Sequence, residues 1–141
     1  ATLGVTVLVG LLLHTFFDGV AIASGFAVSD SLGLLLFLAV FLHKLPEGLT
    51  MASVMLAGGQ SRARALGAAA ALGVATIAGV LLTQTVAPLA AHGLALSAGV
   101  TLYVAASNLV PEFQAKKGWA LPVAFFSGAL TFFVTRALVE R

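Results

Sequence analysis

Charge is what this sequence has least of, since only 9% of its 141 residues are Asp, Glu, Lys or Arg. A soluble globular domain carries roughly 25% charged residues. A chain with so few charges cannot cover a water-facing surface, which excludes an ordinary soluble enzyme, a disordered protein and a nucleic-acid binder. The formal net charge of +2 rests on a handful of ionisable groups, so it describes the loops and not a basic face.

Cysteine is absent, which excludes disulfides, thiolate metal sites and cysteine nucleophiles. Apolar residues make up 60% of the chain, with 15 glycines and 10 phenylalanines, a composition typical of a helical membrane bundle. The N-terminus has no basic region, and its apolar run continues past His14 and Asp18, which does not fit a signal peptide. Because the chain lacks an initiator Met and its first residue already lies in apolar sequence, we expect it to begin inside a longer protein or to be a cleaved piece of one.

Five apolar windows are long enough to cross a bilayer, which takes about 20 residues each. They cover residues 3–27, 32–57, 63–87, 93–110 and 119–139. Turn-forming residues separate them at 28–31, at 58–62, at Pro88 with 91–93, and at 112–118. The sequence therefore predicts an all-α fold, a polytopic bundle of five spans that forms a single transmembrane domain over residues 1–141. Small residues in the third span, Gly67, Gly73 and Gly79 among them, predict close helix packing.

Five spans place alternate loops on opposite sides of the membrane. The N-terminus and the loops with four basic residues fall on one side: Arg62, Arg64, Lys116 and Lys117. The positive-inside bias predicts that this side is cytoplasmic and that the C-terminus is extracytoplasmic. Arg136 and Arg141 run against this bias.

Polar residues cluster in the middle of the first two spans, where charges are costly and usually functional. His14 and Asp18 form one i, i+4 pair, and His43 and Glu47 form another, so each pair lies on one helix face. The two spans are antiparallel with a turn near residue 30, so residues whose numbers sum to about 61 lie at equal depth. This rule places His14 beside Glu47 and Asp18 beside His43. Two imidazoles and two carboxylates suit a divalent transition metal, with Zn²⁺ the first choice.

Other interpretations stay open at this point. A lone His or Asp in a membrane can be an interhelical hydrogen bond, and Lys44 can be a counter-ion to a neighbouring carboxylate. His92 reads as a solvated residue of a loop, and Glu112 as a carboxylate in water at a helix end. Pro46, inside the second span, removes a backbone donor and is expected to bend the helix and free a carbonyl near Leu42.

Two motifs resemble a known family when they are taken together. His14-Thr-Phe-Phe-Asp18-Gly19, followed by His43-Lys-Leu-Pro46-Glu47-Gly48, resembles the fourth and fifth helices of the ZIP (Zrt-/Irt-like) metal transporters. The run from Tyr103 to Glu112 resembles the seventh helix. The resemblance implies an eight-helix fold, of which this chain supplies helices four to eight. It also implies that His14, Asp18, His43 and Glu47 are the main transport site.

The resemblance further implies a second metal site in many family members. Its ligand positions are occupied here by Thr15 and Lys44, and the third span supplies no acid. We therefore expect one metal ion, with the Lys44 ammonium in place of a second cation. By the same resemblance, Asn108 and Glu112 are expected on the path by which the ion leaves toward the cytoplasm.

The expected function is transport of zinc or a similar divalent ion toward the cytoplasm, without enzymatic activity. Fe²⁺, Mn²⁺, Co²⁺ and Cd²⁺ would also accept this ligand set. The alternatives are an intramembrane metal-dependent hydrolase and a structural membrane subunit. The expected location is the cell membrane. The expected partners are the ion, the bilayer and the first three helices of the fold, in the same chain or a separate one. A homodimer is left open.

Overall fold

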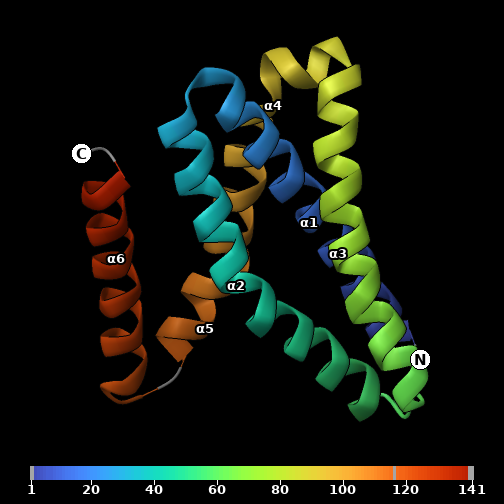
Figure 1. Ribbon diagram of the computed structural model, residues 1–141. Coiled ribbons are helices and arrows are strands. Elements are labelled where there is room, and N and C mark those ends of the chain that lie inside the picture. The colour runs from blue at the N-terminus through green and yellow to red at the C-terminus, as the bar shows by residue number, and fades with distance from the viewer. Residues whose placement is uncertain (1, 116, 140–141) are drawn as a thin grey trace.

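Nearly all of the chain is helical in a computed structural model that describes residues 2–115 and 117–139 (Figure 1). The elements are α1 (Thr2–Val28), α2 (Asp30–Ala57), α3 (Arg62–Thr85), α4 (Ala87–Val104), a π-helix η1 (Ala105–Leu109), α5 (Val110–Ala115) and α6 (Ala120–Val139). No strand occurs among these residues. Five segments are long and apolar enough to cross a membrane: Gly4–Val28, Asp30–Ala57, Arg62–Thr85, Ala87–Ser107 and Ala120–Val139. The predicted all-α bundle of five spans is confirmed.

Serine side chains start two of these helices. The Ser29 hydroxyl accepts a hydrogen bond from the Leu32 N–H at 3.2 Å, and the Ser61 hydroxyl accepts one from the Arg64 N–H at 3.3 Å. Such caps satisfy backbone donors that have no partner inside the helix. Gly59 has a φ of +79°, a conformation that favours glycine, and it turns the chain between α2 and α3. These turns lie where the sequence predicts them.

The turn between the third and fourth spans differs from the prediction. It consists of Val86 alone, and α4 begins at Ala87 with Pro88 in its first turn. A proline is tolerated there because its missing N–H would have no partner anyway. The prediction that residues 91–93 form a loop is therefore wrong. His92 lies within α4, where its side chain is exposed, and Gly93 is buried against α1.

The fourth span also ends differently, because the chain stays helical to Ala115 instead of stopping at Val110. The intervening turn is a π-helix, in which the Val110 N–H bonds to the carbonyl of Ala105. Pro111 follows directly, and a proline ring clashes with the carbonyl four residues earlier in a regular α-helix. A widened turn just before Pro111 relieves that clash.

Helix α1 lies at the centre and packs against α2, α3 and α4. Its contact with α3 is close enough to require glycine on both sides. A Cβ atom on Gly19 would collide with the Thr76 carbonyl, and one on Gly79 would collide with the Phe16 carbonyl. The predicted close packing of the third span thus occurs at Gly79, whereas Gly67 and Gly73 face open space.

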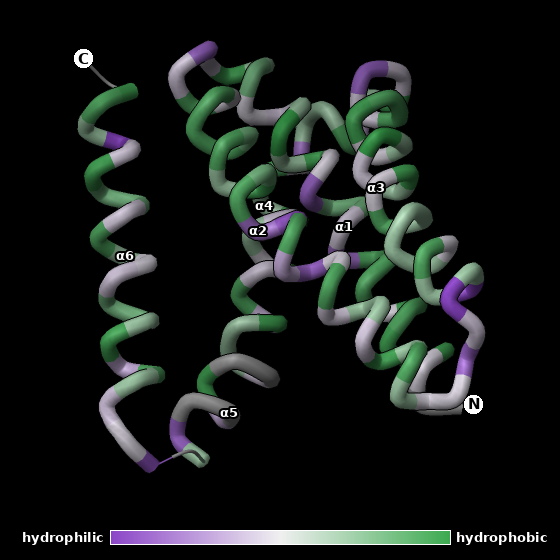
Figure 2. Tube along the Cα trace, turned by 60° about the horizontal axis from the view of Figure 1, so that its bottom comes forward, coloured by the Kyte–Doolittle hydropathy of each residue, from purple (hydrophilic) through white to green (hydrophobic). Residues whose placement is uncertain are grey.

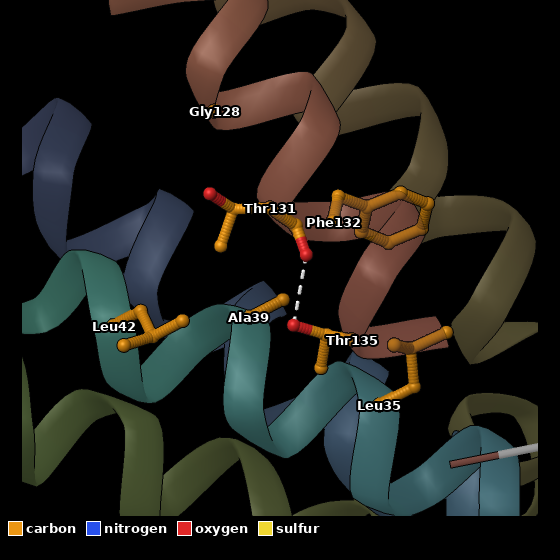
Figure 3. A pocket seen from close by; sticks show the side chains of 7 residues that line it. All are labelled: Leu35, Ala39, Leu42, Gly128, Thr131, Phe132 and Thr135. Carbon is orange, nitrogen blue, oxygen red and sulfur yellow. Dashed lines mark hydrogen bonds between the residues drawn. The ribbon is translucent and has the colours of Figure 1, made fainter. Parts of the chain in front are cut away.

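Helix α6 stands beside the other helices and contacts α2 (Figures 1 and 3). An apolar pocket separates the two helices, with Leu35, Ala39 and Leu42 on one side and Gly128 and Phe132 on the other. None of the described residues of α6 is buried. Its exposed phenylalanines suit a surface that faces lipid or further helices.

Helix α2 changes direction halfway along its length (Figure 1). Pro46 lies inside this helix, as the sequence-based expectation of a bend requires. Figure 2 shows hydrophobic residues along the helices and hydrophilic residues mainly at the turns and where α1 and α2 lie side by side. The bend and the polar residues therefore occur in the same part of the bundle.

Candidate metal centre

Asp18 lies at the centre of the polar residues between α1 and α2, and its side chain is only 7% exposed. His43 Nε2 lies 3.2 Å from Asp18 Oδ2. The equal-depth rule places these two residues opposite each other, and the structure brings them into contact. This contact crosses from one helix to the next, so it fixes the relative register of the two spans.

His14 lies one helical turn before Asp18, and its Nε2 lies 3.8 Å from Asp18 Oδ1. Its ring stacks near that of His43, with ring centroids 6.0 Å apart. One ligand atom each from His14, Asp18 and His43 lie within 4.8 Å of one another. His14 Nδ1 is buried and has no hydrogen-bond partner. These three groups carry the nitrogen and oxygen atoms that a divalent ion such as Zn²⁺ takes as ligands.

A backbone carbonyl orients His43. The Nδ1 atom lies 2.9 Å from the carbonyl oxygen of Ala39, one turn earlier in α2. Because a carbonyl oxygen can only accept a hydrogen bond, Nδ1 carries the proton in this contact. The other ring nitrogen, Nε2, is directed at the Asp18 carboxylate, which also only accepts, so Nε2 donates here and must give up its proton before it can bind a metal.

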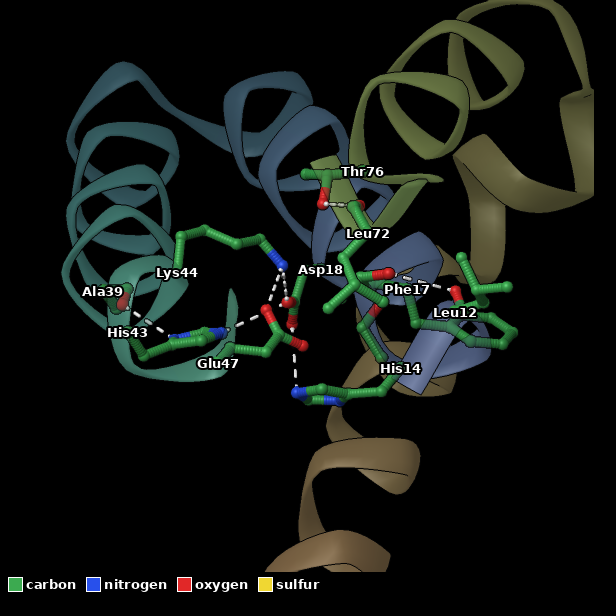
Figure 4. A network of polar contacts seen from close by, with 12 residues as sticks. Leu12, His14, Phe17, Asp18, Ala39, His43, Lys44, Glu47, Leu72 and Thr76 are labelled. Atoms are coloured by element: carbon green, nitrogen blue, oxygen red, sulfur yellow. Dashed lines mark hydrogen bonds and ion pairs between the residues drawn. The ribbon is translucent and has the colours of Figure 1, made fainter. Parts of the chain in front are cut away.

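Glu47, the fourth predicted ligand, is joined to the cluster through Lys44. Lys44 Nζ lies 2.8 Å from Glu47 Oε2 and 2.9 Å from Asp18 Oδ2 (Figure 4). The second Glu47 oxygen, Oε1, is buried without a hydrogen-bond partner. Glu47 does not belong to the group whose ligand atoms lie within 4.8 Å of one another, and among the described residues its hydrogen bond is to Lys44 and not to His14. The structure thus brings three predicted ligands together, and the fourth, Glu47, is bonded to the Lys44 ammonium.

All four predicted ligands nevertheless line one pocket of about 540 Å³. Its opposite wall is formed by Thr101, Val104 and Ala105 at the end of α4 and the start of η1. Sequence reasoning missed this wall. The sequence offered one signal, the polar residues Ser97 and Thr101 four residues apart in an apolar span. In the structure the Ser97 hydroxyl donates to the Phe17 carbonyl at 2.8 Å, next to Asp18.

The positions expected for a second metal hold no carboxylate among the described residues. Thr15 is completely buried, and its hydroxyl donates to the carbonyl of Leu12 at 3.1 Å. In the third span, which supplies no acid, the Thr76 hydroxyl donates to the carbonyl of Leu72 at 3.2 Å (Figure 4). Both hydroxyl protons are therefore used within their own helices. The expected release-path residues, Asn108 and Glu112, lie in η1 and α5, but their side chains are outside the described part of the structure.

The fold and this site define a class: a multi-pass helical membrane protein with a histidine and carboxylate cluster between two spans. The chain belongs to the ZIP family, since the family model described as "ZIP Zinc transporter" matches residues 1–137. This family consists of transporters and is not a class of enzymes. The resemblance seen in the sequence motifs is confirmed.

Several characterised relatives support the assignment. Zinc transporter ZIP6 of Homo sapiens is 36% identical over 79% of this chain and 15% of its own length. Zinc transporter ZIP9 of Micropogonias undulatus is 33% identical over 77% of this chain and 39% of its own. Zinc transporter ZIP4 of Mus musculus is 34% identical over 72% of this chain and 16% of its own. The chain thus spans well under half the length of each, and no solved structure matches it.

Proposed function

We propose that this chain carries the ion-binding part of a transporter that moves zinc, or a similar divalent cation, across the cell membrane toward the cytoplasm. The main support for the proposal is that ligand atoms of His14, Asp18 and His43 lie close together between two helices that are long and apolar enough to cross a membrane. Charged and polar groups at such a depth usually face an interior path and act on an ion or a proton. Membership of a zinc-transporter family supports the same conclusion.

In the proposed mechanism the ion binds to His14, Asp18, His43 and Glu47. Glu47 Oε1 and His14 Nδ1 are buried polar atoms without partners, which supports the presence of a ligand at this place. Glu47 reaches the ion once Lys44 releases its other oxygen. A dication between two carboxylates offsets the unfavourable burial of both charges, which an apolar environment does not do.

The proposed movement is alternating access. The helices that carry the site, α1 and α2, move against a scaffold that includes α4 and α6. The pocket between the cluster and the end of α4 is the proposed space through which the ion passes on one side. The π-helix supports this assignment, because such wide turns occur often at functional sites.

The test is zinc uptake into vesicles that contain the purified protein and a zinc-sensitive dye. We expect His14→Ala to lose uptake, and His92→Ala to keep the uptake of the unchanged protein, because His92 is exposed on α4 away from the cluster. Equal uptake by the two variants would refute the site. An anomalous scattering map from crystals grown with zinc would show the number of ions and their element.

The same experiments separate the rival functions. A structural subunit would bind no metal at the cluster, so a zinc titration would give no saturable binding. A metal-dependent hydrolase would bind zinc but would not fill the vesicles with it.

A further inference from the structure

The Lys44 side chain holds one oxygen of each of the two carboxylates that the proposed metal ion would bind. Its ammonium lies 2.9 Å from Asp18 Oδ2 and 2.8 Å from Glu47 Oε2. The two carboxylates are 7% and 8% exposed, whereas the lysine side chain is 23% exposed. A resident cation thus bridges two nearly buried anions.

The negative charge of the two carboxylates must be balanced by a cation whenever no metal ion is bound, and Lys44 can supply that cation. Two buried carboxylates without a cation are strongly unfavourable in a membrane. An alternating-access transporter must return its empty site across the membrane in every cycle of net uptake. Lys44 lies on α2 next to His43, so its charge moves with the site and needs no ion from solution.

The geometry also lets the ammonium leave. A lysine ammonium is a compact charge on a flexible stem of four carbons, and this one is partly exposed. When a divalent ion takes Asp18 Oδ2 and Glu47 Oε2, the ammonium can swing away while its backbone stays in α2. Bound metal and bound ammonium are then mutually exclusive on these oxygens.

We infer that Lys44 is a tethered counter-ion. It neutralises part of the charge on Asp18 and Glu47 while the empty carrier returns, and each incoming metal ion must displace it. This inference rests on the proposed transport function. It predicts that removing the ammonium has opposite effects on two steps. Zinc binding becomes tighter, because the metal loses a competitor, and return of the empty carrier becomes slower, because the carboxylates lose their cation.

The experiment compares two modes of zinc movement in vesicles that contain the complete protein. Net uptake of radioactive zinc into metal-free vesicles requires return of the empty site. Exchange of radioactive zinc outside for unlabelled zinc inside returns the site loaded, so it needs no counter-ion. Zinc affinity is measured separately by titration of the purified protein.

For Lys44→Met we expect net uptake to fall by about tenfold or more, while exchange stays close to that of the unchanged protein. We expect zinc to bind about tenfold more tightly, because a charge-assisted hydrogen bond no longer competes for the ligand oxygens. Lys44→Gln, which keeps polar contacts but no charge, should behave in the same way. Lys44→Arg, which keeps the charge, should retain a ratio of net uptake to exchange close to that of the unchanged protein.

Other outcomes would overturn the inference. If net uptake and exchange fall together, or if zinc affinity drops in both uncharged variants, Lys44 is a structural ion-pair partner. Unchanged uptake and affinity would also contradict it. If the unchanged protein shows neither net uptake nor exchange, the transport function itself fails, and the counter-ion role fails with it.

Discussion

Single residues in the cluster differ in how many contacts they make. Asp18 lies near three partners, His14, His43 and Lys44, and its carboxylate holds α1 and α2 together. Glu47 contacts Lys44 through one oxygen, and its other oxygen is buried without a hydrogen-bond partner among the described residues. Loss of Asp18 would therefore disturb both packing and ion binding, whereas Glu47 offers a cleaner test of ion binding alone.

We expect Glu47→Ala to abolish zinc uptake while the protein still reaches the membrane. The variant removes one proposed ligand and leaves the Asp18 contacts with His43 and Lys44 in place. The measurement is dye-detected uptake, normalised to the amount of protein in the membrane. Leu49→Ala is a suitable control, because Leu49 lies on the same helix with an exposed side chain and is outside the lining of the pocket that holds the cluster. Normal uptake by Glu47→Ala would exclude it as a ligand.

Zinc uptake should weaken in acid because metal and protons compete for the same groups. Imidazole and carboxylate ligands must be deprotonated to bind a metal ion. Lowering the external pH from about 7.5 to about 5.5 should therefore raise the zinc concentration needed for half-maximal uptake. Initial rates over a range of zinc concentrations at each pH measure this shift. A half-saturating concentration that does not change with pH would contradict competition at these ligands.

Depth in the membrane could be predicted from sequence, whereas side-chain direction could not. Antiparallel spans with a turn near residue 30 necessarily place Asp18 level with His43, and the contact at 3.2 Å follows. The same rule placed His14 beside Glu47; both residues line one pocket, and the hydrogen bond that the Glu47 carboxylate accepts comes from Lys44. Residue spacing defines a helix face, and only the three-dimensional arrangement decides which of several charges on that face form a pair.

At the level of helices, the contact between α1 and α3 supports the site from behind. Phe16 and Gly19, on either side of Asp18, lie against α3 at Gly79 and Thr76. Without a strong hydrophobic driving force between helices in lipid, such association depends on close van der Waals packing. A change at this contact should therefore alter both stability and the position of Asp18.

We expect Gly79→Ala to destabilise the protein and Gly73→Ala to leave it as stable as before or slightly more stable. The new methyl group at position 79 meets the Phe16 carbonyl, and overpacking of this kind costs about 1–3 kcal/mol. At position 73 nothing lies within 4 Å, and alanine is the better helix former. Thermal unfolding of the two variants in detergent measures the difference. Equal melting temperatures would show that α1 and α3 do not need this close approach.

Local sequence signals predicted the turns formed by serine and glycine but misplaced others. Pro88 and Gly93 both look like turn residues, yet Pro88 fits a first helical turn, and Gly93 is needed for packing against Ser24. The π-helix before Pro111 also escaped prediction, because hydropathy does not distinguish a wide turn from a regular one. In each case a tertiary contact or a proline ring, and not local hydropathy, determined the structure.

On the scale of the whole molecule, the five spans and their order follow from apolar length alone, but the side of the membrane on which each loop lies does not. The orientation proposed here depends on basic loop residues, with Arg62 and Arg64 at the start of α3. If the protein had the opposite orientation in the membrane, the same movement through the site would carry the ion away from the cytoplasm. An independent measurement of loop position therefore tests the proposed inward transport.

The absence of cysteine makes that measurement simple. We expect Ser61→Cys, next to Arg62, to be protected from a membrane-impermeant thiol reagent in intact cells and labelled once the membrane is permeabilised. Ser31 lies in the first turn of α2, and Ser61 follows the other end of the same helix, so the two are expected on opposite sides of the membrane. Ser31 is exposed, and Ser31→Cys should therefore be labelled in intact cells. Both side chains are exposed, so neither substitution should disturb packing; Ser61→Cys also removes the hydroxyl that caps α3, at a cost of about 1 kcal/mol. The reverse pattern would place the basic loop outside the cell and would contradict transport toward the cytoplasm as proposed.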